Sequence, residues 1–400
     1  MARIIGGIGT SHVPTIGLAY DKGKQNEPAW APMFKGYEPV AQWLAEQKPD
    51  VMVMFYNDHA NSFFFDCYPT FALGVSPNHE FADEGAGKRP LPDIAGHPDL
   101  AIHIVEQLVA DEFDLTVFQD RPLDHGVNSP LSLMLPHQGG WPLSLVPLEV
   151  NVLQYPLPTA NRCYRLGQAL RRAIESFEQD LKVVVVGTGG LSHQVHGERS
   201  GFNNTEMGHG VPRPDRQRSG ASCQDEARRL RAPRRRGKRR DDHVARDARR
   251  ARPEGPGAAS QLLPCDQHRD GRDDLRRRGG VMNPQLVGVE ELTGTYPFDI
   301  RQSMKAMRLN RFFWQMREAS ARALWLENRT AAYDAAGLTP EERTLVDNTD
   351  WIGLIRYGVS FFVLEKFARV VKITNLGVYA SMRGETLEEF LKTRQVPDAV

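Results

Sequence analysis

The chain has 400 residues, with 50 Lys and Arg against 50 Asp and Glu, and 40% of its residues are hydrophobic. This length and composition predict two or three domains with at least one sizeable core. No apolar run approaches the roughly 20 residues that span a bilayer, and the first residues lack the layout of a secretion signal. Four cysteines are too few for a disulfide framework. We therefore expect a globular cytoplasmic protein with no membrane partner.

The zero net charge is the sum of two unlike parts. Residues 211–280 hold 20 Arg and one Lys against 11 acidic residues, and they contain no Phe, Trp, Tyr, Ile or Met. The rest of the chain has 29 basic and 39 acidic residues and all 34 aromatic ones. Because a stretch without large apolar side chains cannot build a core, this composition predicts disorder. The composition changes abruptly near residue 207 and changes back near residue 281.

The first 200 residues alternate apolar runs with amphipathic segments. Continuous apolar runs predict buried strands at 3–9, 51–56, 144–152 and 182–187. Apolar residues at helical spacing predict helices at 38–48, 100–108 and 164–177. Strands that alternate with helices indicate an α/β fold, in which helices flank a parallel or mixed sheet on both faces.

The pattern becomes entirely helical after residue 285. The sequence predicts long helical stretches over 301–327 and 350–371, and capped helices that follow Thr339 and Thr386. Methionines and aromatics at helical spacing, Met304 among them, are expected in the core of this part. We therefore predict an α/β domain over residues 1–280 and a small all-helical domain over residues 281–400.

Three histidines follow predicted strands directly, namely His12, His59 and His193, and His125 lies in a turn-like segment. Ligands of open α/β sheets collect beyond the carboxyl ends of the strands, so these imidazoles are expected to converge on one crevice. Two histidines and one carboxylate are the ligand set of many non-haem iron oxygenases. The alternative is that each histidine is structural, and the spacing alone selects neither a metal nor a reaction.

Several motifs resemble those of class III (LigB-type) extradiol ring-cleavage dioxygenases. They are Ser11-His12, Asn57-Asp58-His59, Asp124-His125-Gly126, Gly189-Gly190-Leu191-Ser192-His193-Gln194 and the run from Gly201 to Glu206. The helical part resembles the small subunit of protocatechuate 4,5-dioxygenases, in the runs at 292–297, 357–362 and 375–384. Both parts in one chain resemble the arrangement of gallate dioxygenases.

The resemblance implies an Fe(II) enzyme that opens the ring of gallate, or alternatively of protocatechuate, next to its adjacent hydroxyls with O₂. His12, His59 and a glutamate would hold the iron. His193 would be the general base that takes a phenolic proton, a task that suits an imidazole titrating near neutrality. His125 would hydrogen-bond the substrate or oxygen. The resemblance also implies a homodimer.

The family pattern breaks off after Glu206, where a string such as W-D-M-E-F-L-D is expected. A reading frame moved by one base restores it, because Met207 is ATG and glycine codons begin with G, which forces TGG, tryptophan. The same shift permits E-M-I-M-W-L-A-M-R-G-A from Arg240 onward and N-Y-Y-L from Gln261. We therefore interpret residues 207–280 as a frameshifted segment, which arose either in the gene or in the reading of its DNA.

The iron glutamate of the family lies in the E-M-I-M-W string, so its codon straddles Arg240 and Asp241, and the chain as given lacks this ligand. We do not assign the nearby Asp241 and Asp242 as ligands. Two other interpretations of the segment are an arginine-rich arm that binds nucleic acid and a solvated disordered insert. The frameshift accounts for the edges, the missing aromatics and the family gap together, so no nucleic-acid partner is expected. The remaining alternative is an inactive product that lacks its metal.

Overall fold

The computed structural model describes residues 1–85, 87–190, 193–203, 284–286 and 288–393. These residues belong to one compact unit, formed by Met1–Gly208 and Asn283–Val400. The second unit, His209–Met282, lies outside the described residues. The predicted disorder and frameshift of 207–280, and the predicted domain boundary at 280/281, therefore also lie outside them.

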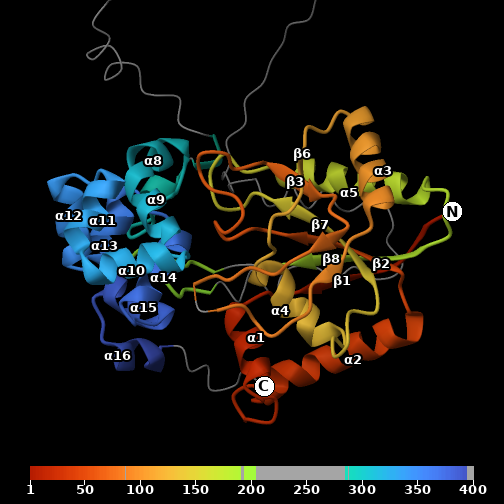
Figure 1. Ribbon diagram of the computed structural model, residues 1–400, viewed down its shortest axis with the longest axis horizontal. Helices are drawn as coiled ribbons and strands as arrows, with labels where there is room; N and C mark the ends of the chain where they lie inside the picture. The colour runs from red at the N-terminus through yellow and green to blue at the C-terminus, as the bar shows by residue number, and fades with distance from the viewer. Residues whose placement is uncertain (86, 191–192, 204–283, 287, 394–400) are drawn as a thin grey trace, which may run out of the picture. The chain divides into compact units, whose positions relative to one another are not determined.

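Six strands form one mixed sheet in the order β1-β8-β2-β7-β3-β6 (Figure 1). They are β1 (Arg3–Thr10), β2 (Val51–Tyr56), β3 (Phe71–Gly74), β6 (Thr116–Phe118), β7 (Ser144–Val150) and β8 (Lys182–Thr188). All neighbours pair in parallel except β3 and β7, which are antiparallel. A separate two-stranded ribbon joins β4 (Asn78–His79) to β5 (Ile94–Ala95). The expectation of an α/β fold with a mixed sheet is confirmed.

Helices cover both faces of the sheet (Figure 1). They are α1 (Pro14–Asp21), α2 (Ala31–Gln47), α3 (Pro98–Ala110), α4 (His125–Met134) and α5 (Ala160–Glu175). Successive strand residues face opposite cores: Val51 and Val53 pack with α3 and α5, whereas Met52 and Met54 pack with α2 and α4. A strand that is buried on both faces reads as a continuous apolar run, which is why these strands were predictable.

The C-terminal part is helical, as predicted, but its helices are shorter than expected. They are α8 (Ile300–Lys305), α9 (Met307–Gln315), α10 (Ala319–Glu327), α11 (Arg329–Ala336), α12 (Pro340–Asp347), α13 (Trp351–Tyr357), α14 (Phe361–Val370), α15 (Asn375–Arg383) and α16 (Leu387–Lys392), preceded by short 3₁₀ turns η1 (Pro284–Leu286) and η2 (Val289–Glu291). Met304, predicted in the core, is instead 70% exposed. None of the described helices is long and apolar enough to cross a membrane.

The break between α13 and α14 has a local cause. Gly358 adopts a left-handed φ of 119°, and a Cβ at this position would lie 2.9 Å from Gln302 Oε1. Only glycine accepts both constraints without strain, so the chain turns there and starts a new helix. The apolar pattern from 350 to 371 continues across the turn, which is why it predicted one helix.

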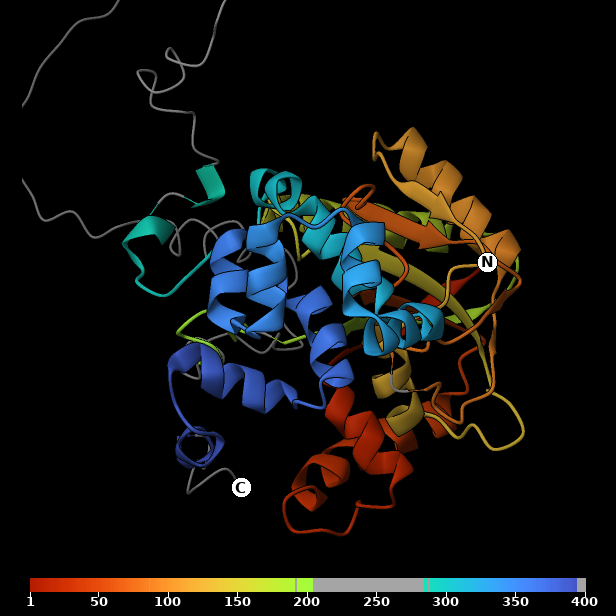
Figure 2. The same ribbon diagram turned by 60° about the vertical axis from the view of Figure 1, so that its left-hand side comes forward.

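The loop that follows β2 packs against the helical part. Ala60, Phe64 and Phe65 of this loop share one core cluster with α9 and α14. Figures 1 and 2 both show these helices gathered beside the sheet. Because the loop follows the carboxyl end of β2, the helical part borders the crevice in which the histidines were expected.

The start of α12 is a capping box, as the sequence predicts. Thr339 accepts a hydrogen bond from the Glu342 amide, and the buried Glu342 carboxylate accepts one from the Thr339 amide. Tyr357 also donates to Glu342, and Arg308 lies 3.4 Å away. Burial acts to raise the pKa of Glu342, but these donors lower it below its ordinary value. The carboxylate therefore contributes stability above the unfolded-state pKa, and this contribution is lost as the pH falls.

The variant Glu342→Gln is therefore expected to lower the free energy of unfolding by about 1 kcal/mol above pH 5, and by progressively less towards pH 3. Urea unfolding at each pH measures the difference from the parent chain. The exposed neighbour Glu341 offers a matched control, because Glu341→Gln should leave stability nearly unchanged. A difference for Glu342→Gln that is independent of pH would contradict this account.

Candidate active site

Three histidine rings meet at the carboxyl end of the sheet. His12 follows β1 and His59 follows β2, and their ring centroids are 4.9 Å apart. His125 lies 5.9 Å from His12 and stacks on His59 at 3.9 Å. Strand β8 lies between β1 and β2, so the strand order itself brings these loops together. All three histidines are buried.

His12 is held by Thr188, the last residue of β8. Its Nδ1 lies 3.0 Å from Thr188 Oγ1, and this hydroxyl also contacts two backbone carbonyls, those of Gly126 at 2.9 Å and Phe55 at 3.2 Å. The single hydroxyl hydrogen is needed by a carbonyl, so Nδ1 of His12 must be the donor. Its Nε2 therefore keeps its lone pair. Burial, followed by repulsion from His59 and His125, lowers the pKa of His12 to about 3, so this ring is neutral.

His59 is held in the same way, by a carboxylate. Its Nδ1 lies 3.0 Å from Asp124 Oδ2, and the same oxygen accepts the backbone amide of His59 at 2.7 Å. Nδ1 is therefore the donor, and the Nε2 lone pair faces Asn57 Nδ2 at 3.1 Å. Burial acts to raise the pKa of Asp124, but His59 holds it well below its ordinary value. A carboxylate behind an imidazole is the usual support of a metal-ligating histidine.

The loop that carries His59 is itself ordered by a buried carboxylate. Asp58 accepts the backbone amides of Asn61, Ser62 and Phe63 at 2.8–3.1 Å. Its backbone carbonyl accepts the Tyr68 hydroxyl. These bonds fix the main chain on both sides of His59, so the direction of the imidazole is set before any ligand arrives.

The donor set suits a divalent transition metal. Thr188 fixes the Nδ1 hydrogen of His12 and Asp124 fixes that of His59, so each ring turns its Nε2 away from its support, the atom with which an imidazole binds Fe(II) or Zn(II). Within the described part of the chain, the one cluster of three metal-binding side chains is His59, Asp124 and His125. Both Asp124 oxygens already accept N–H donors, from His59 and Gly126, so Asp124 orients His59 rather than binding a cation.

His125 is the first residue of α4, where the sequence had predicted a turn. Its Nδ1 lies 2.7 Å from Glu84 Oε2, and its backbone amide donates to Glu84 Oε1 at 2.8 Å. Burial opposes the charge on this ring, but Glu84 overcomes the penalty and raises the pKa of His125 to about 9. Burial likewise opposes the charge on Glu84, yet His125 lowers the pKa of Glu84 to about 2. The protonated ring can donate a hydrogen bond and cannot accept a proton.

His193 lies after β8, as predicted, and it is exposed, whereas the other three histidines are buried. It is close enough to His12 to contribute to the lowering of the pKa of His12. Its backbone forms a bridge with Asn203, near the end of the described N-terminal part. The structure therefore brings three predicted histidines into a buried cluster and places the fourth, which is exposed, close to His12.

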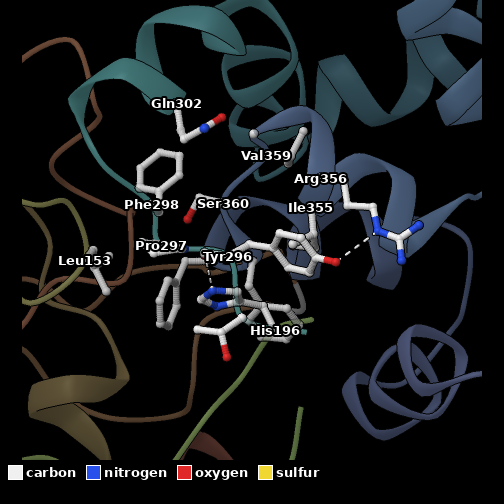
Figure 3. A pocket seen from close by; sticks show the side chains of 14 residues that line it. Leu153, His196, Tyr296, Pro297, Phe298, Gln302, Ile355, Arg356, Val359 and Ser360 are labelled. Carbon is white, nitrogen blue, oxygen red and sulfur yellow. Dashed lines mark hydrogen bonds between the residues drawn. The ribbon is translucent and has the colours of Figure 1, made fainter. Parts of the chain in front are cut away.

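An aromatic cavity of about 130 Å³ lies next to this centre (Figure 3). Phe362 lines the cavity, and its ring centroid is 5.3 Å from that of His59, so the cavity and the histidine cluster share this wall. On another side, the Tyr296 hydroxyl accepts a hydrogen bond from Arg356 at 3.1 Å. His196 Nε2 lies 2.7 Å from the Tyr296 carbonyl oxygen.

Comparisons with known proteins match both parts of the chain. Residues 6–213 match the catalytic LigB subunit of aromatic ring-opening dioxygenases, and residues 309–395 match the LigA subunit of LigAB dioxygenases. A gallate dioxygenase of Pseudomonas putida is 45% identical over 331 residues, covering 78% of this chain and 96% of that protein. The chain belongs to the LigAB family of aromatic ring-opening dioxygenases. The resemblance stated from the motifs is thereby confirmed.

More distant relatives of this dioxygenase family share only the first part. Two 2,3-dihydroxyphenylpropionate/2,3-dihydroxicinnamic acid 1,2-dioxygenases, from Photorhabdus laumondii and Klebsiella pneumoniae, are each 31% identical, over 186 and 190 residues. The chain spans about half the length of these relatives, with 46% of its own residues. Neither of the two family models covers residues 214–308.

Three residues that hold the histidines of this dioxygenase were not predicted from the sequence. Thr188, Asp124 and Glu84 contact their histidines across 176, 65 and 41 positions of the chain. A signal was present only for Asp124, since Asp before His-Gly is a typical helix N-cap, and Asp124 does cap α4. Glu84 lies in a loop without any such pattern.

Asp124→Asn is expected to lower the free energy of unfolding of the metal-free chain by about 2–4 kcal/mol. An asparagine with its oxygen towards His59 turns its amide hydrogens towards the Gly126 N–H, which leaves buried donors facing each other. Urea unfolding at pH 7 measures the effect, with the exposed Asp114→Asn as the matched control. A loss no larger than that of the control would show that Asp124 does not anchor the site.

Proposed function

We propose that this dioxygenase is an Fe(II)-dependent extradiol enzyme that opens the ring of gallate with O₂, and that the chain as given retains two of its three iron ligands. The observation that carries the proposal is the pair His12 and His59, 4.9 Å apart, each with Nδ1 held as a donor. Bound Fe(II) would supply a Lewis-acidic centre that brings the dihydroxylated ring and O₂ together. The third ligand belongs to the segment outside the described residues.

The surrounding residues divide the proton chemistry. His125, kept protonated by Glu84, donates a hydrogen bond to an oxygen of the reacting pair and stabilises negative charge there. His193, which is exposed, would accept the phenolic proton as the substrate enters. Thr188 keeps His12, and Asp124 keeps His59, in the tautomer with the hydrogen on Nδ1, which leaves Nε2 to bind a metal.

Gallate is proposed as substrate because the gallate dioxygenase relative matches over 96% of its length. Protocatechuate, which has one ring hydroxyl fewer, is the alternative substrate. O₂ uptake by a frame-corrected chain with each compound separates them. If kcat/KM is higher for protocatechuate than for gallate, protocatechuate is the substrate and the gallate proposal is wrong.

The third ligand is tested at the level of the gene. Neither family model covers residues 214–308, and the shifted frame restores the family strings within that stretch, which supports the frameshift. Sequencing the DNA across codons 200–285 should reveal a one-base insertion or deletion near codon 207 and a compensating one before codon 281, or an error in the sequence as read. A DNA sequence that encodes this stretch as given, together with full iron binding, would refute the frameshift interpretation.

A further inference from the structure

One face of α14 is directed at the histidine cluster. Phe362, Lys366 and Arg369 are spaced by four and three residues, so they lie on the same side of this helix. Phe362 contacts the His59 ring at 5.3 Å. Lys366 and Arg369 donate hydrogen bonds to main-chain carbonyls of two loops, one that contains His59 and one that contains Glu84.

Lys366 reaches the loop that follows β2. Its side chain is 1% exposed, and its Nζ donates to the backbone carbonyl of His59 and to that of Phe362, each at 3.0 Å. It is the one fully buried lysine or arginine among the described residues. The nearest carboxylate, Glu365, lies 4.0 Å away, so the main-chain carbonyls are its closest partners. A charge is rarely placed in such a position unless its hydrogen bonds are needed there.

Arg369 reaches the second loop, three residues further along the helix. Its guanidinium donates to the backbone carbonyl of Glu84. The carboxylate of Glu84 in turn holds both the Nδ1 and the backbone amide of His125. The same helix face thus fixes the carbonyl of one histidine and the carbonyl of the residue that orients another.

We propose that α14 is a positioning element of the active site, in which Lys366 sets the main chain of the iron ligand His59 and Arg369 sets Glu84 and through it His125. The metal role of His59 rests on the proposed function, whereas the positioning contacts are properties of the metal-free chain. The helical part of the fusion thereby shapes the histidine cluster from a separate region of the sequence. Neither cation is a catalytic residue, since neither touches the reacting atoms.

The test replaces Lys366 by methionine in the full chain, since methionine keeps the side-chain length and removes the donor. The amides to follow are those of His59, Asn61, Ser62 and Phe63, which are bonded to Asp124 and Asp58. Hydrogen exchange at these amides is expected to accelerate about tenfold, while exchange in β8 stays unchanged. Lys372→Met, an exposed lysine just after α14, is the matched control.

A spectroscopic readout separates positioning from general support. The ring ¹⁵N signals of His59 are expected to shift in Lys366→Met, and those of His125 in Arg369→Met, while the signals of the distant His97 and His103 stay in place. Arg369→Lys, which keeps a donor cation, should restore most of the parent spectrum. Arg369 is only partly buried, so this pair of variants decides the question even where Lys366→Met does not fold.

Unchanged exchange and unchanged His59 and His125 signals would overturn the proposal, and so would acceleration spread evenly over the chain. Because none of these readouts needs a metal, they are independent of the iron site. Failure of both the chain as given and the frame-corrected chain to bind Fe(II) would refute the proposed function but not the positioning role of α14. Localised changes in the variants would still support the role of α14.

Discussion

The chain as given, loaded with Fe(II) without oxygen, is expected to consume O₂ with gallate at least about a thousandfold more slowly than the frame-corrected chain. A factor of this size is a modest part of the 10⁶-fold or greater acceleration that enzymes typically achieve. The reason is that, in the proposed site, His12 and His59 supply two imidazoles, whereas the frameshift interpretation places the glutamate codon across Arg240 and Asp241. Metal binding contributes to folding because the site does not exist in the unfolded chain, so the loss of one ligand weakens both metal binding and folding.

An oxygen electrode with gallate measures this difference directly. The frame-corrected chain with His12→Ala is the matched control, because it has the segment restored and a different ligand removed. It is expected to be as slow as the chain as given. Comparable rates for the given and corrected chains would show that the segment supplies nothing the reaction needs.

His193→Ala in the frame-corrected chain is expected to lower kcat by about 10²–10⁴-fold, the usual contribution of a general base. The side chain is exposed, so its loss should leave Fe(II) content and stability close to those of the parent. Titration with gallate in the absence of O₂, monitored by light absorption, measures substrate affinity separately from turnover.

The comparison variant is His103→Ala, on the surface helix α3, whose ring contacts Ala173 and Ser176. It should retain the parent kcat. If His193→Ala retains the parent kcat, His193 is not the general base. The raised pKa of His125 makes that residue a poor substitute, because it is already protonated at neutral pH.

Much of the sheet was predictable because its central strands are buried on both faces. The runs at Val51–Tyr56 and Lys182–Thr188 consist mostly of apolar residues, and such a run predicts a strand that is buried on both faces. The strands that were missed, β3 and β6, have four and three residues, too few to establish a period. In the helical part, the single glycine at 358 divided one apolar pattern into two helices.

The histidines of the candidate site were predictable from the sequence, but the residues that hold them were not. Histidines at strand ends are visible along the chain, and strand order then brings His12 and His59 together. Their supports were not visible, because Thr188, Asp124 and Glu84 act across long separations that depend on the finished fold. The contacts of Lys366 with the His59 loop, 307 residues away, belong to the same class.

Iron content is the most direct test of the central claim, that His12 and His59 form two thirds of an Fe(II) site. Each chain would be loaded anaerobically, desalted and analysed for metal by mass spectrometry. The account predicts close to one iron per frame-corrected chain, and far less in the chain as given and in corrected chains with His12→Ala or His59→Ala. One iron in the corrected chain regardless of either histidine substitution would contradict it.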